Sequence, residues 1–236
     1  MNEFTTGPMV LEEFMKIVSL MENPEGSEAV RKALRFYQIP DKLEYKWGNN
    51  SELMKILHHY DNPQNEWELA QMLKLVEGKD SLLEIGSNFG GTLKRMASVM
   101  NKGARIVSVD LAADDTPSFL NPQASLRDTC RKIALVGGNV ELFLGNSHNE
   151  EVKKKVSNFA PYDFVFIDGD HSYEGVKKDW EDYGPMGRIV GFHDIGGGVT
   201  DVVKFWTELK CTTKYRTEEF ISDHEKKFGI GIVYRE

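Results

Sequence analysis

Two patterns of apolar positions alternate along most of the chain. Short runs of consecutive apolar residues are typical of strands buried on both faces, whereas apolar residues repeated every three or four positions indicate one face of a helix. An apolar run at residues 82–85 ends abruptly at Gly86 and predicts a strand. A helical repeat follows two further glycines, at Leu93, Met96, Ala97 and Met100. This stretch therefore predicts a strand, a glycine turn and a helix.

The same alternation continues to the end of the chain. Apolar or β-branched runs predict further strands at residues 104–110, 140–144, 164–167, 187–194, 214–221 and 228–234. Helical spacing predicts helices at residues 64–77, 123–136, 150–159, 173–183 and 199–209. Strands that alternate with helices favour an α/β, doubly wound, Rossmann-like fold.

Residues 1–63 show a different organisation. Apolar residues recur there at helical spacing, and Pro40 and the Asn62-Pro63 pair interrupt the pattern. No catalytic motif lies in this segment. We expect residues 1–63 to form a helical cap beside the ligand cleft of a domain spanning residues 64–236, where the cap helps to select the substrate or forms a homo-oligomer.

Composition and charge argue against nucleic acid and membranes as partners of the protein. The chain has 236 residues and a net charge of −8, with no basic stripe, which predicts that it does not bind nucleic acid. No apolar run approaches membrane-spanning length, and the first residues have no signal-peptide pattern, so no membrane partner is expected. Cys130 and Cys211 form no CxxC motif, which favours reduced thiols and a cytoplasmic location.

The glycine turn after the first predicted strand is the first candidate ligand site. The spacing Gly86-x-x-x-Gly90 is neither the dinucleotide fingerprint nor a phosphate-binding Walker loop. By itself it is equally compatible with an ordinary turn. The strand at residues 104–110, however, ends in Asp110, and an acid at the end of the second strand can accept hydrogen bonds from ribose hydroxyls. The glycine turn and Asp110 together favour a nucleoside-containing ligand.

The stretch Leu82-Leu-Glu-Ile-Gly-Ser-Asn-Phe-Gly-Gly91, together with Val109-Asp110, resembles the cofactor site of class I S-adenosylmethionine-dependent methyltransferases. The resemblance implies a seven-stranded sheet whose last strand is antiparallel. It also implies that the glycine turn holds the methionine end of the cofactor, that Asp110 holds the ribose, and that Asn146 reaches the adenine. The cofactor contacts that it implies are Glu84, Gly86, Ser87, Gly90, Asp110, Leu111, Asn146, Ser147 and Asp168.

Acids and histidines follow the next two predicted strands. Asp168-Gly-Asp-His-Ser-Tyr173 comes after one, and His193-Asp194 ends the other. Because the carboxyl ends of neighbouring parallel strands meet at one edge, these side chains are expected to converge. Carboxylates suit Mg²⁺ or Mn²⁺, and an imidazole shifts the preference toward Mn²⁺, Fe²⁺ or Zn²⁺.

Both motifs resemble a branch of class I methyltransferases that includes small-molecule and sugar O-methyltransferases and cephalosporin-hydroxylase-like proteins. The resemblance implies a metal site made of Asp168, His193 and Asp194, although many relatives have an acid or an amide at the position of His193. His171 is the candidate general base, with Asp168 as its catalytic partner, because an imidazole titrates near neutral pH. Alternatively, His171 or Asp170 caps the following helix, and Asp168 contacts only the cofactor amine.

The resulting prediction is an enzyme that transfers a methyl group from S-adenosylmethionine to a hydroxyl of a small molecule or sugar, with Mg²⁺ or Mn²⁺ as a candidate second cofactor. Two alternatives stay open on the same scaffold: a metal-dependent hydroxylase-like protein and a non-catalytic binding protein. A nicotinamide-dependent dehydrogenase is disfavoured because the G-x-G-x-x-G motif is absent.

Overall fold

The computed structural model describes residues 65–111, 122–197, 200–223 and 228–235. The expected helical cap at residues 1–63, its boundary at residue 64 and its expected role in oligomer formation therefore lie outside the described residues. None of the described helices is both long enough and apolar enough to cross a lipid bilayer.

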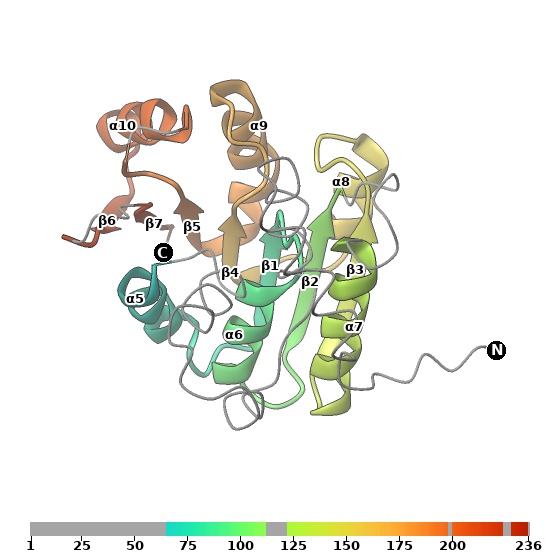
Figure 1. The fold of residues 1–236 in the computed structure, drawn as a ribbon. Helices are drawn as coiled ribbons and strands as arrows, with labels where there is room; N and C mark the ends of the chain where they lie inside the picture. The colour runs from blue at the N-terminus through green and yellow to red at the C-terminus, as the bar shows by residue number, and fades with distance from the viewer. Residues whose placement is uncertain (1–64, 112–121, 198–199, 224–227, 236) are drawn as a thin grey trace, which may run out of the picture. The chain divides into compact units, whose positions relative to one another are not determined.

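A seven-stranded sheet forms the centre of the described part, in the order β3-β2-β1-β4-β5-β7-β6 (Figure 1). The strands are β1 Ser81–Ile85, β2 Arg105–Asp110, β3 Asn139–Leu144, β4 Tyr162–Ile167, β5 Gly187–His193, β6 Arg216–Phe220 and β7 Ile230–Tyr234. The first five run parallel, and β7 is antiparallel to both of its neighbours, β5 and β6. The predicted doubly wound fold with an antiparallel last strand is confirmed.

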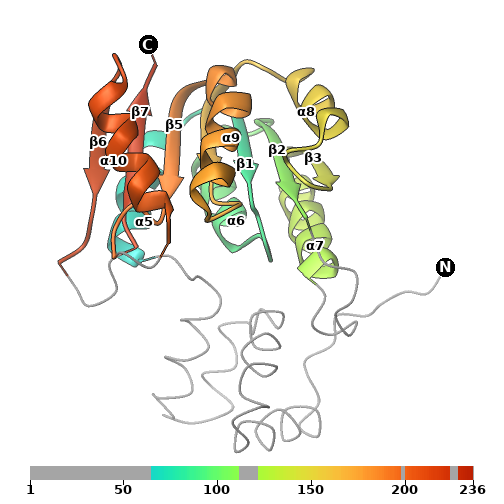
Figure 2. The same ribbon diagram turned by 90° about the horizontal axis from the view of Figure 1, so that it is seen from above.

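Helices cover both faces of this sheet. They are α5 Glu66–Val76, α6 Gly91–Val99, α7 Pro122–Leu135, α8 Glu150–Ser157, α9 Tyr173–Tyr183 and α10 Val202–Thr212, with a short 3₁₀ helix, η3 Gly184–Met186, after α9. Helices α5, α6 and α7 share one apolar cluster with the sheet, and α8, α9 and α10 share the other (Figure 2). The described part is therefore a three-layer α/β/α sandwich.

Alternate residues of the central strands enter the two clusters. On β4, Phe164 and Phe166 point toward the α5–α7 layer, whereas Val165 and Ile167 point toward the α8–α10 layer. All four are at most 2% exposed. Burial on both faces favours apolar side chains at consecutive positions, which explains the continuous apolar run at residues 164–167 of β4.

The order of the strands determines where a ligand can bind. Strand β1 pairs with β2 on one side and with β4 on the other. The chain therefore adds β2 and β3 on one side of β1 and then crosses over to add β4 on the other side. At such a switch point the connections after the two adjacent strands diverge to opposite faces of the sheet. The carboxyl ends of β1 and β4 therefore border the crevice in which open α/β sheets bind ligands.

The opposite, amino end of these strands is joined by Asp163. Its Oδ2 accepts hydrogen bonds from the backbone N–H of Asp80 and of Ser81, at 3.1 and 3.0 Å, and from the Ser81 hydroxyl at 3.0 Å. The Ser81 Oγ in turn accepts a hydrogen bond from the backbone N–H of Asp163 at 2.9 Å. These contacts fix the start of β1 against β4.

Asp163→Ala should lower the free energy of unfolding by about 1–3 kcal/mol, because three donors lose their acceptor. Asp128→Ala is the matched control, since its ion pair with Lys132 lies on the surface of α7 and is expected to contribute less than about 1 kcal/mol. Urea denaturation of both variants measures the difference. Equal losses in the two variants would contradict the account.

Candidate active site

Gly86 allows the end of β1 to lie directly against the loop after β4. Its φ of +87° falls in the left-handed region, and a Cβ at this position would collide with the backbone carbonyl of Asp168. The backbone ties the same point together, because Gly86 N–H donates to Val109 C=O and Asp168 N–H donates to Ile85 C=O, both at 2.8 Å. Only glycine fits this position, since any side chain would separate the two loops.

The turn continues to the start of α6 under similar constraints. Gly90 has a φ of +84°, and a Cβ there would lie 2.8 Å from Thr129 Cγ2 on α7. Asn88 also has a positive φ, +49°, and its backbone N–H donates to Asp110 Oδ2 at 2.6 Å. The Asp110 carboxylate thus fixes the glycine turn from the end of β2. It lies where the sequence predicted a ribose-binding acid.

Glu84 lies beneath this turn and is only 1% exposed. Burial raises its pKa to about 8, Ser87 opposes the shift through a hydrogen bond, and the nearby Asp168 and Asp110 carboxylates add to it. Its Oε2 is buried and has no hydrogen-bond partner among the residues that the structure describes. Ser87 also accepts a 2.7 Å hydrogen bond from the hydroxyl of Ser108 on β2. Glu84 is therefore largely protonated at neutral pH.

The polar side chains of the turn after β3 have hydrogen-bond partners within the protein. Asn146 Oδ1 accepts a hydrogen bond from His148 N–H at 2.8 Å and so shapes the turn itself. The Ser147 hydroxyl donates to Asp179 Oδ1 at 2.8 Å, and His148 Nε2 lies 3.2 Å from the same oxygen. Leu111, by contrast, is 69% exposed at the end of β2.

Asp179 is a buried residue that the sequence analysis missed. It is fully buried on α9, and burial raises its pKa. A signal was present in the sequence, because Asp179 lies three residues after Val176 and four before Tyr183, on the apolar face of the helix. An acid at a core position needs polar partners, and here Ser147 and His148 supply them.

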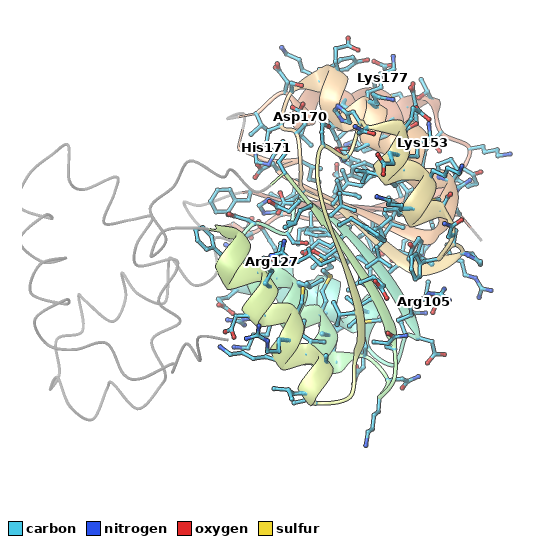
Figure 3. The ribbon with its side chains drawn as sticks, turned by 90° about the vertical axis from the view of Figure 1, so that its right-hand side faces the viewer. Arg105, Arg127, Lys153, Asp170, His171 and Lys177 are labelled. Atoms are coloured by element: carbon cyan, nitrogen blue, oxygen red, sulfur yellow. The ribbon has the colours of Figure 1, made fainter. Side chains whose placement is uncertain are left out.

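The acids and histidines after β4 and β5 do converge, as predicted. His193 Nδ1 lies 3.1 Å from Asp168 Oδ1 and 3.2 Å from Asp194 Oδ1. His171 lies on their exposed side, with Nε2 at 3.4 Å from Asp168 Oδ1 and Nδ1 at 3.6 Å from Asp194 Oδ2. We call these four residues the Asp–His cluster. Figure 3 shows His171 and Asp170 at one end of the strands and Arg105, at the start of β2, toward the other end.

The capping alternatives are resolved by the hydrogen bonds at the start of α9. Ser172 is the N-cap, and its hydroxyl accepts from Gly175 N–H at 3.1 Å. Asp170 Oδ1 accepts from Ser172 N–H at 2.9 Å and so supports the turn before the helix. His171 caps nothing and faces the two acids instead.

Mutual interactions set the charges within the Asp–His cluster. Burial alone would raise the pKa of Asp168, but His193 and His171 outweigh it and hold this pKa at about 2. Burial likewise opposes the charged form of His193, yet Asp168 and then Asp194 raise its pKa. The pKa of Asp194 is raised by burial and by the Asp168 carboxylate, and His193 partly offsets this. Asp168 therefore carries the negative charge that organises the cluster.

The donor set fits a divalent cation. One ligand atom from each of Asp168, His193 and Asp194 lies within 4.8 Å of the others. Adjacent ligands of an octahedral ion with bonds of about 2.1 Å are roughly 3 Å apart, which matches the 3.1 and 3.2 Å separations here. Without a cation, the same distances correspond to an Nδ1–H group shared between two carboxylates. A cation at this position would take the place of that proton.

The raised pKa of Glu84 generates a dependence of stability on pH. In the unfolded chain Glu84 has its ordinary pKa of 4.5, and in the folded protein the pKa is about 8. Between these values only the folded state holds the proton, so the free energy of unfolding falls as pH rises, by at most about 1.4 kcal/mol per pH unit. Glu84→Gln cannot ionise and should lack this loss.

Urea denaturation at about pH 5 and about pH 8 measures this effect. The stability of Glu84→Gln relative to the unsubstituted protein should increase between the two values. A constant difference would show that Glu84 ionises normally in the folded state.

Comparison with known proteins agrees with this geometry. A family described as a methyltransferase domain matches residues 83–195, from within β1 to two residues after β5. No curated protein sequence is significantly similar to the chain.

Several solved structures share the fold. An O-methyltransferase from Bacillus cereus, in complex with SAH, is 16% identical with a TM-score of 0.54 and covers 82% of this chain and 96% of its own. The O-methyltransferase TomG from Streptomyces achromogenes, involved in tomaymycin synthesis and in complex with SAM, is 16% identical with a TM-score of 0.55 and covers 96% and 99%. A TDP-rhamnose 3′-O-methyltransferase of calicheamicin biosynthesis is 16% identical with a TM-score of 0.54 and covers 99% of both chains. Residues 83–195 therefore match a methyltransferase domain, and the chain shares its fold with these O-methyltransferases.

Proposed function

We propose that the protein transfers the methyl group of S-adenosylmethionine to a hydroxyl of a small molecule or sugar, assisted by a divalent cation. The observation that carries the proposal is the direct contact between Gly86 and the Asp168 loop, which places the glycine turn beside the Asp–His cluster. The O-methyltransferases of similar fold support the choice of a hydroxyl, since one of them acts on a sugar.

The cofactor binds across the ends of β1 and β2 in this proposal. The backbone between Gly86 and Gly90 accommodates the methionine part, and Asp110 accepts hydrogen bonds from the ribose. The carboxylates of Asp110 and Asp168 adjoin the turn and create a negative potential that favours a cationic ligand, whereas Glu84 is largely neutral. The other contacts come from Ser87, Leu111, Asn146 and Ser147. Since the Asn146 and Ser147 side chains already shape their loop, we expect their backbone to supply these contacts.

The metal ligands are Asp168, His193 and Asp194, and Mn²⁺ and Mg²⁺ are the candidate ions. When bound, the cation lowers the pKa of the acceptor hydroxyl and fixes its position. The chain's own contribution is to hold the three donors in place, through the Asp168–Ile85 backbone hydrogen bond on one side and the β5–β7 pairing of His193 on the other. Asp168 thus faces both the cofactor turn and the metal site.

His171 is the proposed general base. It is 48% exposed at the outer side of the cluster, where an acceptor can approach. A hydrogen bond to Asp168 raises the pKa of His171, while partial burial opposes the shift. As the methyl–oxygen bond forms and the sulfur–methyl bond breaks, the hydroxyl proton passes to the ring. Both ring nitrogens face carboxylates, so one of these contacts must yield to the acceptor.

The cofactor assignment is tested with Asp110. Asp110→Asn retains an acceptor for the Asn88 N–H but removes the charge, whereas Asp110→Ala removes both. We expect calorimetric titration to show S-adenosylhomocysteine binding weakened by about 1–3 kcal/mol in Asp110→Ala, which is roughly a 5- to 150-fold change. Unchanged affinity in both variants would remove Asp110 from the site. Absence of binding to the unsubstituted protein would overturn the cofactor assignment itself.

The base assignment is tested with His171→Ala. Loss of proton transfer should lower turnover by about 10²- to 10⁴-fold, with nearly unchanged affinity for S-adenosylhomocysteine, because His171 contacts acids rather than the glycine turn. Release of S-adenosylhomocysteine with a panel of phenols, sugars and nucleotide sugars identifies the acceptor and gives the rate. Full turnover in this variant would exclude His171 as the base.

A further inference from the structure

The two nitrogens of the His193 ring lie in contrasting surroundings. Nδ1 faces Asp168 and Asp194, whereas Nε2 is buried and has no hydrogen-bond partner among the described residues. The rings of Phe228 and Phe166 lie near that of His193, with centroids 5.6 and 6.4 Å away. Since the residue is only 6% exposed, bulk solvent does not reach Nε2.

The position of His193 on β5 indicates what this inner nitrogen faces. Side chains two residues apart on a strand point to the same face, so His193 shares the face of Ile189. Ile189 packs in the apolar cluster that contains Leu69 and Met72 of α5. The imidazole therefore lies on the side of the sheet that α5 covers.

Glu68 is a buried acid on that helix. It is 0% exposed, and its two oxygens accept hydrogen bonds from the backbone N–H of Ser222, at 2.8 Å, and of Gly229, at 3.0 Å. A carboxylate can accept about four hydrogen bonds, so these two contacts leave capacity for another donor. Nothing in the cofactor or metal chemistry described above uses this residue.

The segment that Glu68 holds is in contact with the end of β5. Gly196 N–H donates to Phe228 C=O at 2.7 Å, and Ile195 N–H donates to Gly229 C=O at 3.3 Å. Across the β5–β7 pairing, His193 lies opposite Ile230, the residue that follows Gly229. Glu68 therefore binds the backbone of the segment that pairs with His193.

A neutral imidazole carries one proton. If Nδ1 binds a cation, its lone pair is used and the proton must reside on Nε2. A buried N–H without an acceptor is costly, and metal-binding histidines usually donate their second N–H to a carboxylate, a carbonyl or a water. Glu68 is a buried carboxylate on that side of the sheet, and it binds the segment that pairs with His193.

We propose that Glu68 is a positioning residue for the metal site, which accepts the Nε2–H of His193, directly or through one water, and thereby keeps Nδ1 free to bind the cation. This inference rests on the metal-assisted function proposed above. It extends the metal site by one carboxylate that comes from α5, outside residues 83–195.

The test is calorimetric titration of the chelator-treated full chain with Mn²⁺. Glu68→Gln should weaken Mn²⁺ binding by about 10- to 100-fold, as is typical when the partner of a metal-binding histidine is lost. Glu66→Gln is the matched control, because Glu66 is on the same helix but its side chain is 68% exposed, and it should bind Mn²⁺ normally. Affinity for S-adenosylhomocysteine should stay the same in both variants.

A double-mutant cycle separates this role from a purely structural one. If Glu68 acts through the imidazole, Glu68→Gln should no longer affect Mn²⁺ affinity in a His193→Asn background. An equal loss in both backgrounds would mean that Glu68 only holds the Ser222–Gly229 segment, and would overturn the proposal. The proposal would also be overturned if the single variant Glu68→Gln bound Mn²⁺ as tightly as the unsubstituted protein. If the unsubstituted protein binds no Mn²⁺, the proposed metal site fails as well.

Discussion

The close approach of Gly86 to the Asp168 loop is the constraint on which the site depends. Because Gly86 has no side chain and adopts a positive φ, the end of β1 rests against the backbone of the loop after β4. The parallel pairing of β1 with β4 brings these ends to the same edge, and the Asp168–Ile85 hydrogen bond fixes them there. The glycine turn and the Asp–His cluster thus form one continuous site.

Such a site concentrates acids that are unfavourable to bury. Glu84 responds by retaining its proton, whereas Asp168 stays charged because two histidines compensate it. A cationic cofactor and a divalent metal would each supply the positive charge that this region lacks. The arrangement therefore favours the bound state electrostatically, since the acids are held in place by backbone contacts before any ligand arrives.

Local patterns predicted much of this structure. The apolar runs and helical repeats predicted the alternating strands and helices of an α/β fold, and the rule that parallel strands end at one edge predicted the meeting of Asp168 with His193 and Asp194. Other features depend on contacts between distant segments. Glu68 binds Ser222 and Gly229, more than 150 residues away, and no local pattern indicates such a partner. Likewise, no local pattern indicated that the side chains of Asn146 and Ser147 bind His148 and Asp179.

The central claim is that a cofactor and a cation bind side by side at the ends of β1, β4 and β5. Nuclear magnetic resonance with S-adenosylmethionine labelled with ¹³C in its transferable methyl group tests this most directly, by comparing the protein loaded with Mn²⁺ and with Mg²⁺. Adjacent sites predict that paramagnetic Mn²⁺ strongly broadens the bound methyl resonance, and that Asp168→Ala abolishes the effect. Identical spectra with the two ions, with both cofactor and metal bound, would contradict the account.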